Sequence, residues 1–173
     1  MNEIIAGILQ QQLSSGFPDL AGSHVSATIP VSERLINEII AKTLPPAGAV
    51  QDVQLEALEG NQIKVRLRAW AGPLNLPMTV TLAIDEQPAL PHRPVLGLRL
   101  AGVPLLLSMA GPVARFLDVL PKGITLDGDR ISVNLQTLLA QHNQGDLVRY
   151  LTELRVTTAA GAVIVALRAR VPA

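Results

Sequence analysis

Between Leu74 and Ile84 every second residue is apolar, and this alternation constrains the fold more than any other feature of the chain. A period of two is typical of a β-strand with one dry face. At about 3.3 Å per residue the run would span roughly 36 Å, which is long for a strand. A strand of this length must twist and curve, and Pro77 inside it indicates a sheet edge or a bulge.

The rest of the chain predicts an antiparallel sheet with a few helices, an α+β fold. Ser32 is a typical N-cap for a helix that runs to about Leu44, and Asn134 is a typical N-cap for a last helix that runs through Gly145 to Leu151. Helical spacing also appears at residues 4–13 and 104–120. Alternation recurs at 25–31, 53–57, 63–69, 96–100, 124–133, 154–158 and 163–171.

The apolar residues are almost all aliphatic. Of the 173 residues 49% are hydrophobic, and the aromatic ones are Phe17, Trp70, Phe116 and Tyr150. An aliphatic lining suits flexible acyl chains, whose affinity comes from buried area at about 25 cal/mol per Å², whereas aromatic rings recognise flat ligands. The same composition also fits an ordinary packed core without a cavity, so both interpretations stay open.

Charge and cysteine content exclude several classes of function. Fourteen basic residues balance fourteen acidic ones, which argues against a nucleic-acid partner because phosphate binding needs a net positive face. The absence of cysteine excludes disulfides and thiolate metal sites. We expect a cytoplasmic protein, because the N-terminus lacks a basic, apolar signal and no window approaches about 18 uninterrupted apolar residues.

The sequence holds no residue set typical of catalysis or metal binding. Of the three histidines, His24, His92 and His142, only His142 has a carboxylate at helical spacing, Asp146, and this pair alone does not form a metal site. The serines lack a nucleophile-elbow context, and residues 127–129 are typical of a hairpin turn. We therefore expect a protein that is not an enzyme and has no cofactor or metal.

Basic residues gather on two of the predicted strands. Lys64, Arg66 and Arg68 share one strand face, and Arg168 and Arg170 share another. Such a face suits peripheral contact with a membrane or an acidic partner. The alternative is the solvated side of an antiparallel sheet, where charges discourage aggregation.

The stretch from Ile29 to Ile40, Ile-Pro-Val-Ser-Glu-Arg-Leu-Ile-Asn-Glu-Ile-Ile, resembles the strand-to-helix opening of bacterial proteins of the tubular lipid-binding (TULIP) superfamily. Residues 35–37 resemble the Leu-x-Asn-like signature of that helix. The resemblance covers residues 23–171 of a single domain, 1–173, with residues 1–20 as an N-terminal amphipathic helix. The later elements follow in matching order: the hairpin at Gly60-Asn61, the strand 78–84, the apolar segment ending in Leu120-Pro121, strands 124–133 and the final hairpin 154–171.

This resemblance implies a long, strongly curved antiparallel sheet wrapped around a helix, a TULIP-like half-barrel with an apolar groove for a lipid or another hydrophobic small molecule. An extended tube would then require a homodimer. The competing hypothesis is a structural or protein-interaction module whose apolar surface is closed by dimerisation or by a partner. The residues expected to line the groove are Leu35, Ile39, Ile40, Leu76, Met78, Val80, Leu98, Leu100, Leu106, Met109, Val113 and Leu117.

Overall fold

The computed structural model describes residues 21–43, 50–71, 74–101, 122–141 and 144–172, and within these ranges the protein consists mainly of antiparallel strands with a few helices. This composition fits the α+β class. The elements are β1 (His24–Ser32), α2 (Glu33–Thr43), β2 (Val50–Leu58), β3 (Gln62–Ala71), β4 (Leu74–Glu86), β5 (Val95–Ala101), β6 (Ile124–Asp127), β7 (Arg130–Asn134), α4 (Leu135–Ala140), the 3₁₀-helix η2 (Gly145–Tyr150), β8 (Leu151–Ala159) and β9 (Ala162–Arg170).

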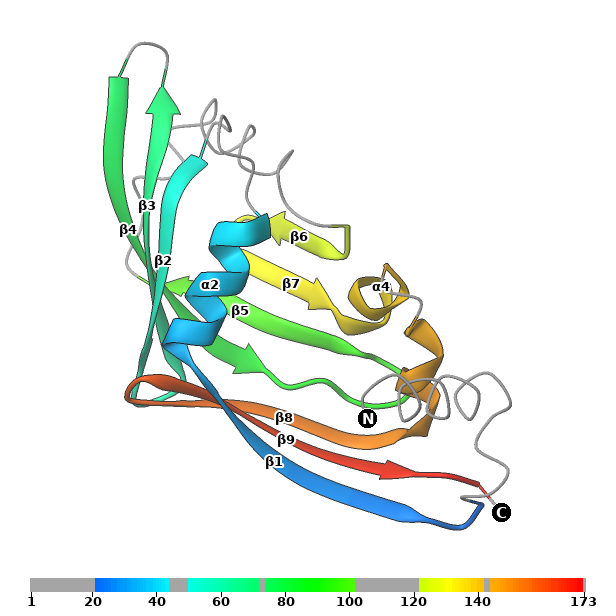
Figure 1. Cartoon of the computed structure of the whole chain (residues 1–173). Helices are drawn as coiled ribbons and strands as arrows, with labels where there is room; N and C mark the ends of the chain where they lie inside the picture. Colours follow the sequence, from blue (N-terminus) through cyan, green and yellow to red (C-terminus); the bar gives the residue numbers. More distant parts are fainter. Residues whose placement is uncertain (1–20, 44–49, 72–73, 102–121, 142–143, 173) are drawn as a thin grey trace.

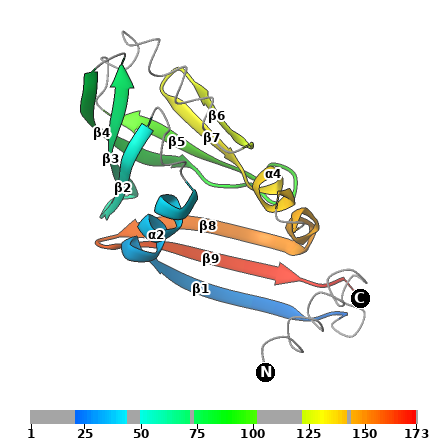
Figure 2. The same cartoon turned by 45° about the horizontal axis from the view of Figure 1, so that its top comes forward.

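The strands form two sheets, where the sequence analysis expects one. Sheet A has the order β1-β9-β8, and sheet B has the order β2-β3-β4-β5-β7-β6. Figures 1 and 2 show α2 leading from sheet A to sheet B at one end, while α4 and η2 lead back to sheet A at the other. The two sheets are therefore connected through α2 at one end and through α4 and η2 at the other.

The long central strand is confirmed and extends slightly further than its alternation predicts. It is β4, with thirteen residues. Pro77 is opposite Arg68 of β3, but the described part of β5 pairs with β4 only from Thr81 onward. Pro77 therefore lies in a stretch with a described strand on one side, which is where a residue without an N–H is tolerated.

Ser32 caps α2 as predicted, because its Oγ accepts a hydrogen bond of 3.4 Å from the N–H of Leu35. Asn134 caps α4, accepting from the N–H of Thr137 at 3.0 Å. The prediction of one continuous last helix is wrong, since α4 ends at Ala140 and the chain resumes as η2 at Gly145. A Cβ on Gly145 would lie 3.0 Å from that of Ala140. The two short helices thus approach closely at Gly145, where a larger residue would require a small shift of Ala140.

The charged residues lie mostly on the outer faces of the sheets and form ion pairs across strands. The carboxylate of Glu56 forms ion pairs with Arg66 at 2.7 Å and with Lys64 at 3.4 Å. Arg168 pairs with Glu153 at 3.0 Å. Two of the basic residues on the expected membrane-contact face thus share one carboxylate, which favours the interpretation of a solvated outer surface.

Two helical predictions lie outside the described residues: the amphipathic helix within 1–20 and the apolar segment 104–120. Within the described ranges, the structure contains no helix with the length and hydropathy needed to cross a bilayer.

Candidate functional site

One face of sheet B is apolar across all of its strands. In antiparallel pairs, directly opposite residues point to the same side, so the register places Leu82 beside Ile63 and Leu100, and Leu98 beside Ile131. We call this set the inner face of sheet B. Its members are Leu55, Ala57, Ile63, Val65, Leu67, Met78, Val80, Leu82, Ile84, Leu96, Leu98, Leu100, Ile124, Leu126, Ile131 and Val133.

Sheet A has a matching apolar face. The pairs Ile29–Val165 and Val165–Val156 continue one row of aliphatic side chains across its strands. The inner face of sheet A consists of Val25, Ala27, Ile29, Val31, Leu151, Leu154, Val156, Thr158, Val163, Val165, Leu167 and Ala169. Neither inner face contains a charged residue, and Thr158 is the single polar one.

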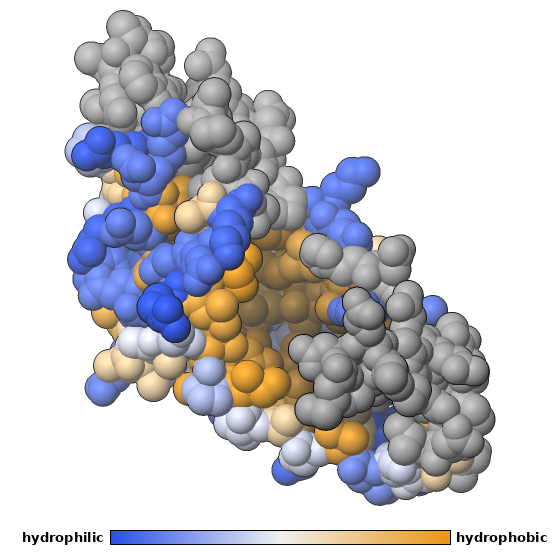
Figure 3. All heavy atoms as spheres, in the orientation of Figure 1, coloured by the Kyte–Doolittle hydropathy of each residue, from blue (hydrophilic) through white to orange (hydrophobic). Residues whose placement is uncertain are grey.

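Figure 3 shows a hydrophobic hollow beside α2, between sheet A and sheet B. Burial agrees with this picture, because Ala57, Ile63, Val80, Leu98 and Val156 are buried and all belong to the inner faces. In contrast, four large apolar side chains are about half exposed: Val25 (54%), Ile29 (46%), Leu35 (47%) and Ile39 (54%). Within the described part of the chain, these five inner-face residues are buried, whereas large apolar side chains on β1 and α2 stay exposed.

The predicted lining residues divide into four groups. Leu35, Ile39 and Ile40 lie on α2, and the first two are among the exposed apolar residues. Met78, Val80, Leu98 and Leu100 share the inner face of sheet B, with Val80 and Leu98 buried. Leu76 belongs to β4 opposite Ala69, while Leu106, Met109, Val113 and Leu117 lie outside the described residues.

The sequence analysis missed Val25 and Ile29 as site residues. Their alternation with polar neighbours is visible in the sequence and predicts the strand. Their exposure is not visible there, because it depends on β1 being the outermost strand of sheet A.

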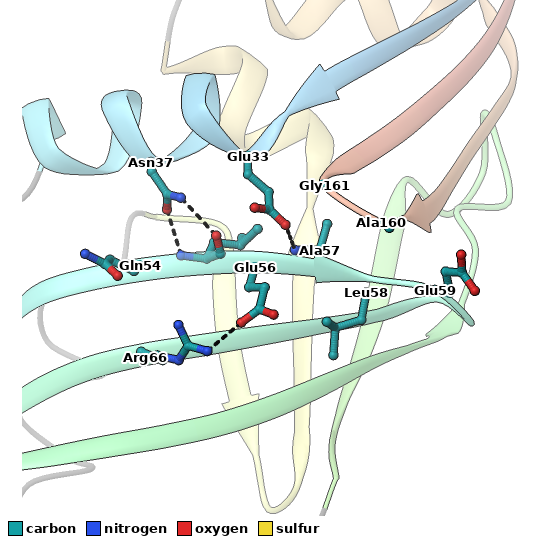
Figure 4. Close-up of a pocket in the computed structure, with 11 residues that line it drawn as sticks. Glu33, Asn37, Gln54, Glu56, Ala57, Leu58, Glu59, Arg66, Ala160 and Gly161 are labelled. Atoms are coloured by element: carbon teal, nitrogen blue, oxygen red, sulfur yellow. Dashed lines mark hydrogen bonds and ion pairs between the residues drawn. The ribbon is translucent and has the colours of Figure 1, made fainter.

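The edge of β2 is closed by α2. The N–H of Leu55 donates to Asn37 Oδ1 at 2.7 Å, and Asn37 Nδ2 donates to the carbonyl of Leu55 at 2.9 Å. Glu33 Oε1 accepts from the N–H of Ala57 at 2.6 Å (Figure 4). The N–H of Gly161 donates to the Ala57 carbonyl at 3.1 Å. Side chains of α2 thus take the place of a neighbouring strand and hold the helix against sheet B.

A second side-chain amide closes the edge of β8. Gln87 Nε2 donates to the carbonyl of Val156 at 2.7 Å, and the N–H of Val156 donates to Gln87 Oε1 at 2.8 Å. The N–H of Thr158 donates to Asn61 Oδ1 at 3.3 Å. Gln87 follows β4 of sheet B directly, so this pair joins sheet B to sheet A.

A pocket of about 590 Å³ lies at the corner where α2, β2 and the β8–β9 turn meet (Figure 4). Its lining includes Glu33, Asn37, Glu56 and Arg66. These four side chains form the hydrogen bonds and the ion pair given above, so their polar groups serve the fold. The described residues also contain no cluster of three histidine, aspartate or glutamate side chains that could hold a metal ion.

No protein-family model, curated protein or solved structure matches this chain.

Proposed function

We propose that this protein binds or carries a lipid, or another molecule with an acyl chain, in the hollow between its inner faces, without catalysing a reaction. The observation that carries the proposal is the half exposure of Val25, Ile29, Leu35 and Ile39 beside faces that hold no charge. Exposed large apolar side chains beside an uncharged apolar surface favour an apolar occupant.

The energetics suit an acyl chain. Each buried methylene contributes about 0.8 kcal/mol, so roughly ten of them contribute about 8 kcal/mol. That corresponds to a dissociation constant of about 1 µM before the cost of ordering the chain is subtracted. Directed polar contacts are not needed, which agrees with inner faces made mostly of Leu, Ile and Val.

The proposed architecture is the TULIP-like one, in which the two sheets together act as a curved wall around α2. Support comes from the direct passage of β1 into α2 at Ser32 and Glu33. Further support comes from Asn37, the Asn of the Leu-x-Asn-like signature, because its side chain fixes α2 to β2. In this arrangement Leu35 and Ile39 border the groove.

A fluorescent fatty acid, cis-parinaric acid, tests the proposal when it is titrated into delipidated protein. We expect saturable binding that a non-fluorescent fatty acid displaces. The variant Ile39→Asn should weaken binding by roughly tenfold, the effect of about 1.4 kcal/mol. Ile39 is half exposed and belongs to α2, so this substitution leaves the buried residues of the inner faces unchanged.

The matched control is Ala41→Asn, which places the same side chain on the opposite side of the same helix. Ala41 is exposed, and we expect the affinity of this variant to equal that of the unaltered protein. The proposal fails if the unaltered protein shows no saturable binding, or if both substitutions weaken binding equally.

A further inference from the structure

The four outermost strands of the two sheets differ in how their edges are closed. Side chains of α2 bond the edge of β2, and Gln87 and Asn61 bond the edge of β8. The described part of β6 is only four residues long. The remaining edge strand, β1, has nine residues, and no hydrogen bond from a described residue is found along its outer side.

The hydrogen-bond pattern identifies which backbone groups of β1 point outward. The N–H of Val171 donates to the carbonyl of Ser23 at 3.0 Å, and the N–H of Glu33 donates to the carbonyl of Gly161 at 3.1 Å. Both hydrogen bonds continue the same β1–β9 register, in which Ala27 lies opposite Leu167. In an antiparallel ladder the bonded positions alternate. The backbone groups of even-numbered residues, including His24, Ser26 and Thr28, therefore face away from β9.

Natural edge strands usually carry a charge, a proline or a bulge that prevents pairing with another chain. In β1 the only such feature is Pro30, which lies near the end of the strand, and the strand contains no lysine, arginine, aspartate or glutamate. Among the described residues, the part from His24 to Thr28 is therefore open to a further strand. Its inner-face residue Val25 is 54% exposed.

We propose that β1 pairs antiparallel with β1 of a second copy of this chain, about a two-fold axis beside Ser26. In this register His24 lies opposite Thr28 of the second copy, and each bonded pair exchanges two N–H···O bonds. On the inner face Val25 lies opposite Ala27 of the second copy. Pro30 lies beyond the last bonded pair, so its missing N–H costs no hydrogen bond.

A second copy fits this edge because the strand is complementary to itself. A two-fold interface brings each residue against its symmetry mate, and β1 places no like charges opposite each other in doing so. The two three-stranded sheets A would become one continuous sheet. The inner faces of sheet A in the two copies would then be contiguous. The pairing itself does not rest on the proposed lipid-binding function.

Hydrogen exchange measured residue by residue by NMR tests the pairing. The amides of Ser26 and Thr28 face outward, whereas those of Ala27 and Ile29 bond to β9. Because the interface is small, we expect it to form between about 10 µM and about 1 mM protein. Over that range, exchange at Ser26 and Thr28 should slow by roughly tenfold or more, while exchange at Ala27 and Ile29 stays slow throughout.

Sedimentation equilibrium of two variants completes the test. Ser26→Pro removes one outward N–H and leaves the bonds to β9 in place, so this variant should remain monomeric. Ser26→Thr keeps the N–H and should form dimers like the unaltered protein. The proposal is overturned if the unaltered protein is monomeric at about 1 mM with unchanged exchange, or if Ser26→Pro still forms dimers. Saturable cis-parinaric acid binding by monomeric Ser26→Pro would show that lipid binding stands without the dimer.

Discussion

The side-chain amide of Asn37 pairs with the backbone of Leu55 as a neighbouring strand would, accepting from its N–H at 2.7 Å and donating to its carbonyl at 2.9 Å. A primary amide carries the same donor and acceptor as a peptide unit. It therefore satisfies the edge of β2 without extending the sheet. The Gln87–Val156 pair repeats this arrangement on β8.

The substitution Asn37→Asp should destabilise the protein, because it places a carboxylate oxygen against the Leu55 carbonyl in place of the amide donor. We expect a loss of about 1–3 kcal/mol in the free energy of unfolding, measured by urea denaturation at pH 7. The control is Glu38→Gln, which affects only an exposed ion pair with Lys42. Its effect should stay within about 0.5 kcal/mol, and an equal effect of both changes would contradict the role given to Asn37.

Gln87→Met keeps the length of the side chain and removes both hydrogen bonds to Val156. Val156 is only 9% exposed, so water replaces the lost partners poorly, and we expect a loss of about 1–3 kcal/mol. Hydrogen exchange at the Val156 amide should become faster. Gln54→Met is the control, because that side chain is exposed. The role of Gln87 is refuted if Val156 stays equally protected in the variant.

Gly97→Ala should be destabilising through overpacking. A Cβ at this position would lie 2.8 Å from the Cβ of Glu86, 2.9 Å from Asp85 Oδ1 and 3.0 Å from Arg130 Nη2. Glu86 also pairs with Arg130 and Arg93, which holds it in place beside the glycine. The expected cost is about 1–3 kcal/mol, seen as a lower midpoint of urea unfolding. An unchanged midpoint would show that this close approach is not required.

Thr158→Val is expected to stabilise the protein. The Oγ1 atom of Thr158 is buried on the inner face of sheet A without a hydrogen-bond partner among the described residues, whereas its backbone N–H keeps the bond to Asn61. Removal of an unpaired buried hydroxyl should raise the free energy of unfolding by about 1 kcal/mol. Thr79→Val is the same substitution at an exposed position and should have little effect. A loss of stability at Thr158 would indicate that its hydroxyl has a partner.

The strands were predictable because their signal is local. Alternation of apolar residues at 63–69 and 74–84 predicts β3 and β4, and their register brings the two apolar sets together, Ile63 beside Leu82. The caps at Ser32 and Asn134 are equally local, since each involves residues three positions apart. Patterns of this kind depend on neighbours along the chain and not on the final arrangement of the sheets.

The junctions between the sheets were not predictable in the same way. Asn37 and Leu55 are 18 positions apart, and Gln87 and Val156 are 69 positions apart. Nothing in the local sequence of Gln87 distinguishes it from an exposed glutamine. The exposure of Val25 likewise follows from the strand order, which alternation does not determine.

The central claim is that the inner faces hold an acyl-chain lipid, and native mass spectrometry of the purified protein tests it most directly. The account predicts a species heavier than the 18.4 kDa chain by the mass of a lipid. Mild organic extraction should remove the added mass, and the extract should contain that lipid. A protein that carries only its own mass, and that acquires none after incubation with a mixed lipid extract, would contradict the account.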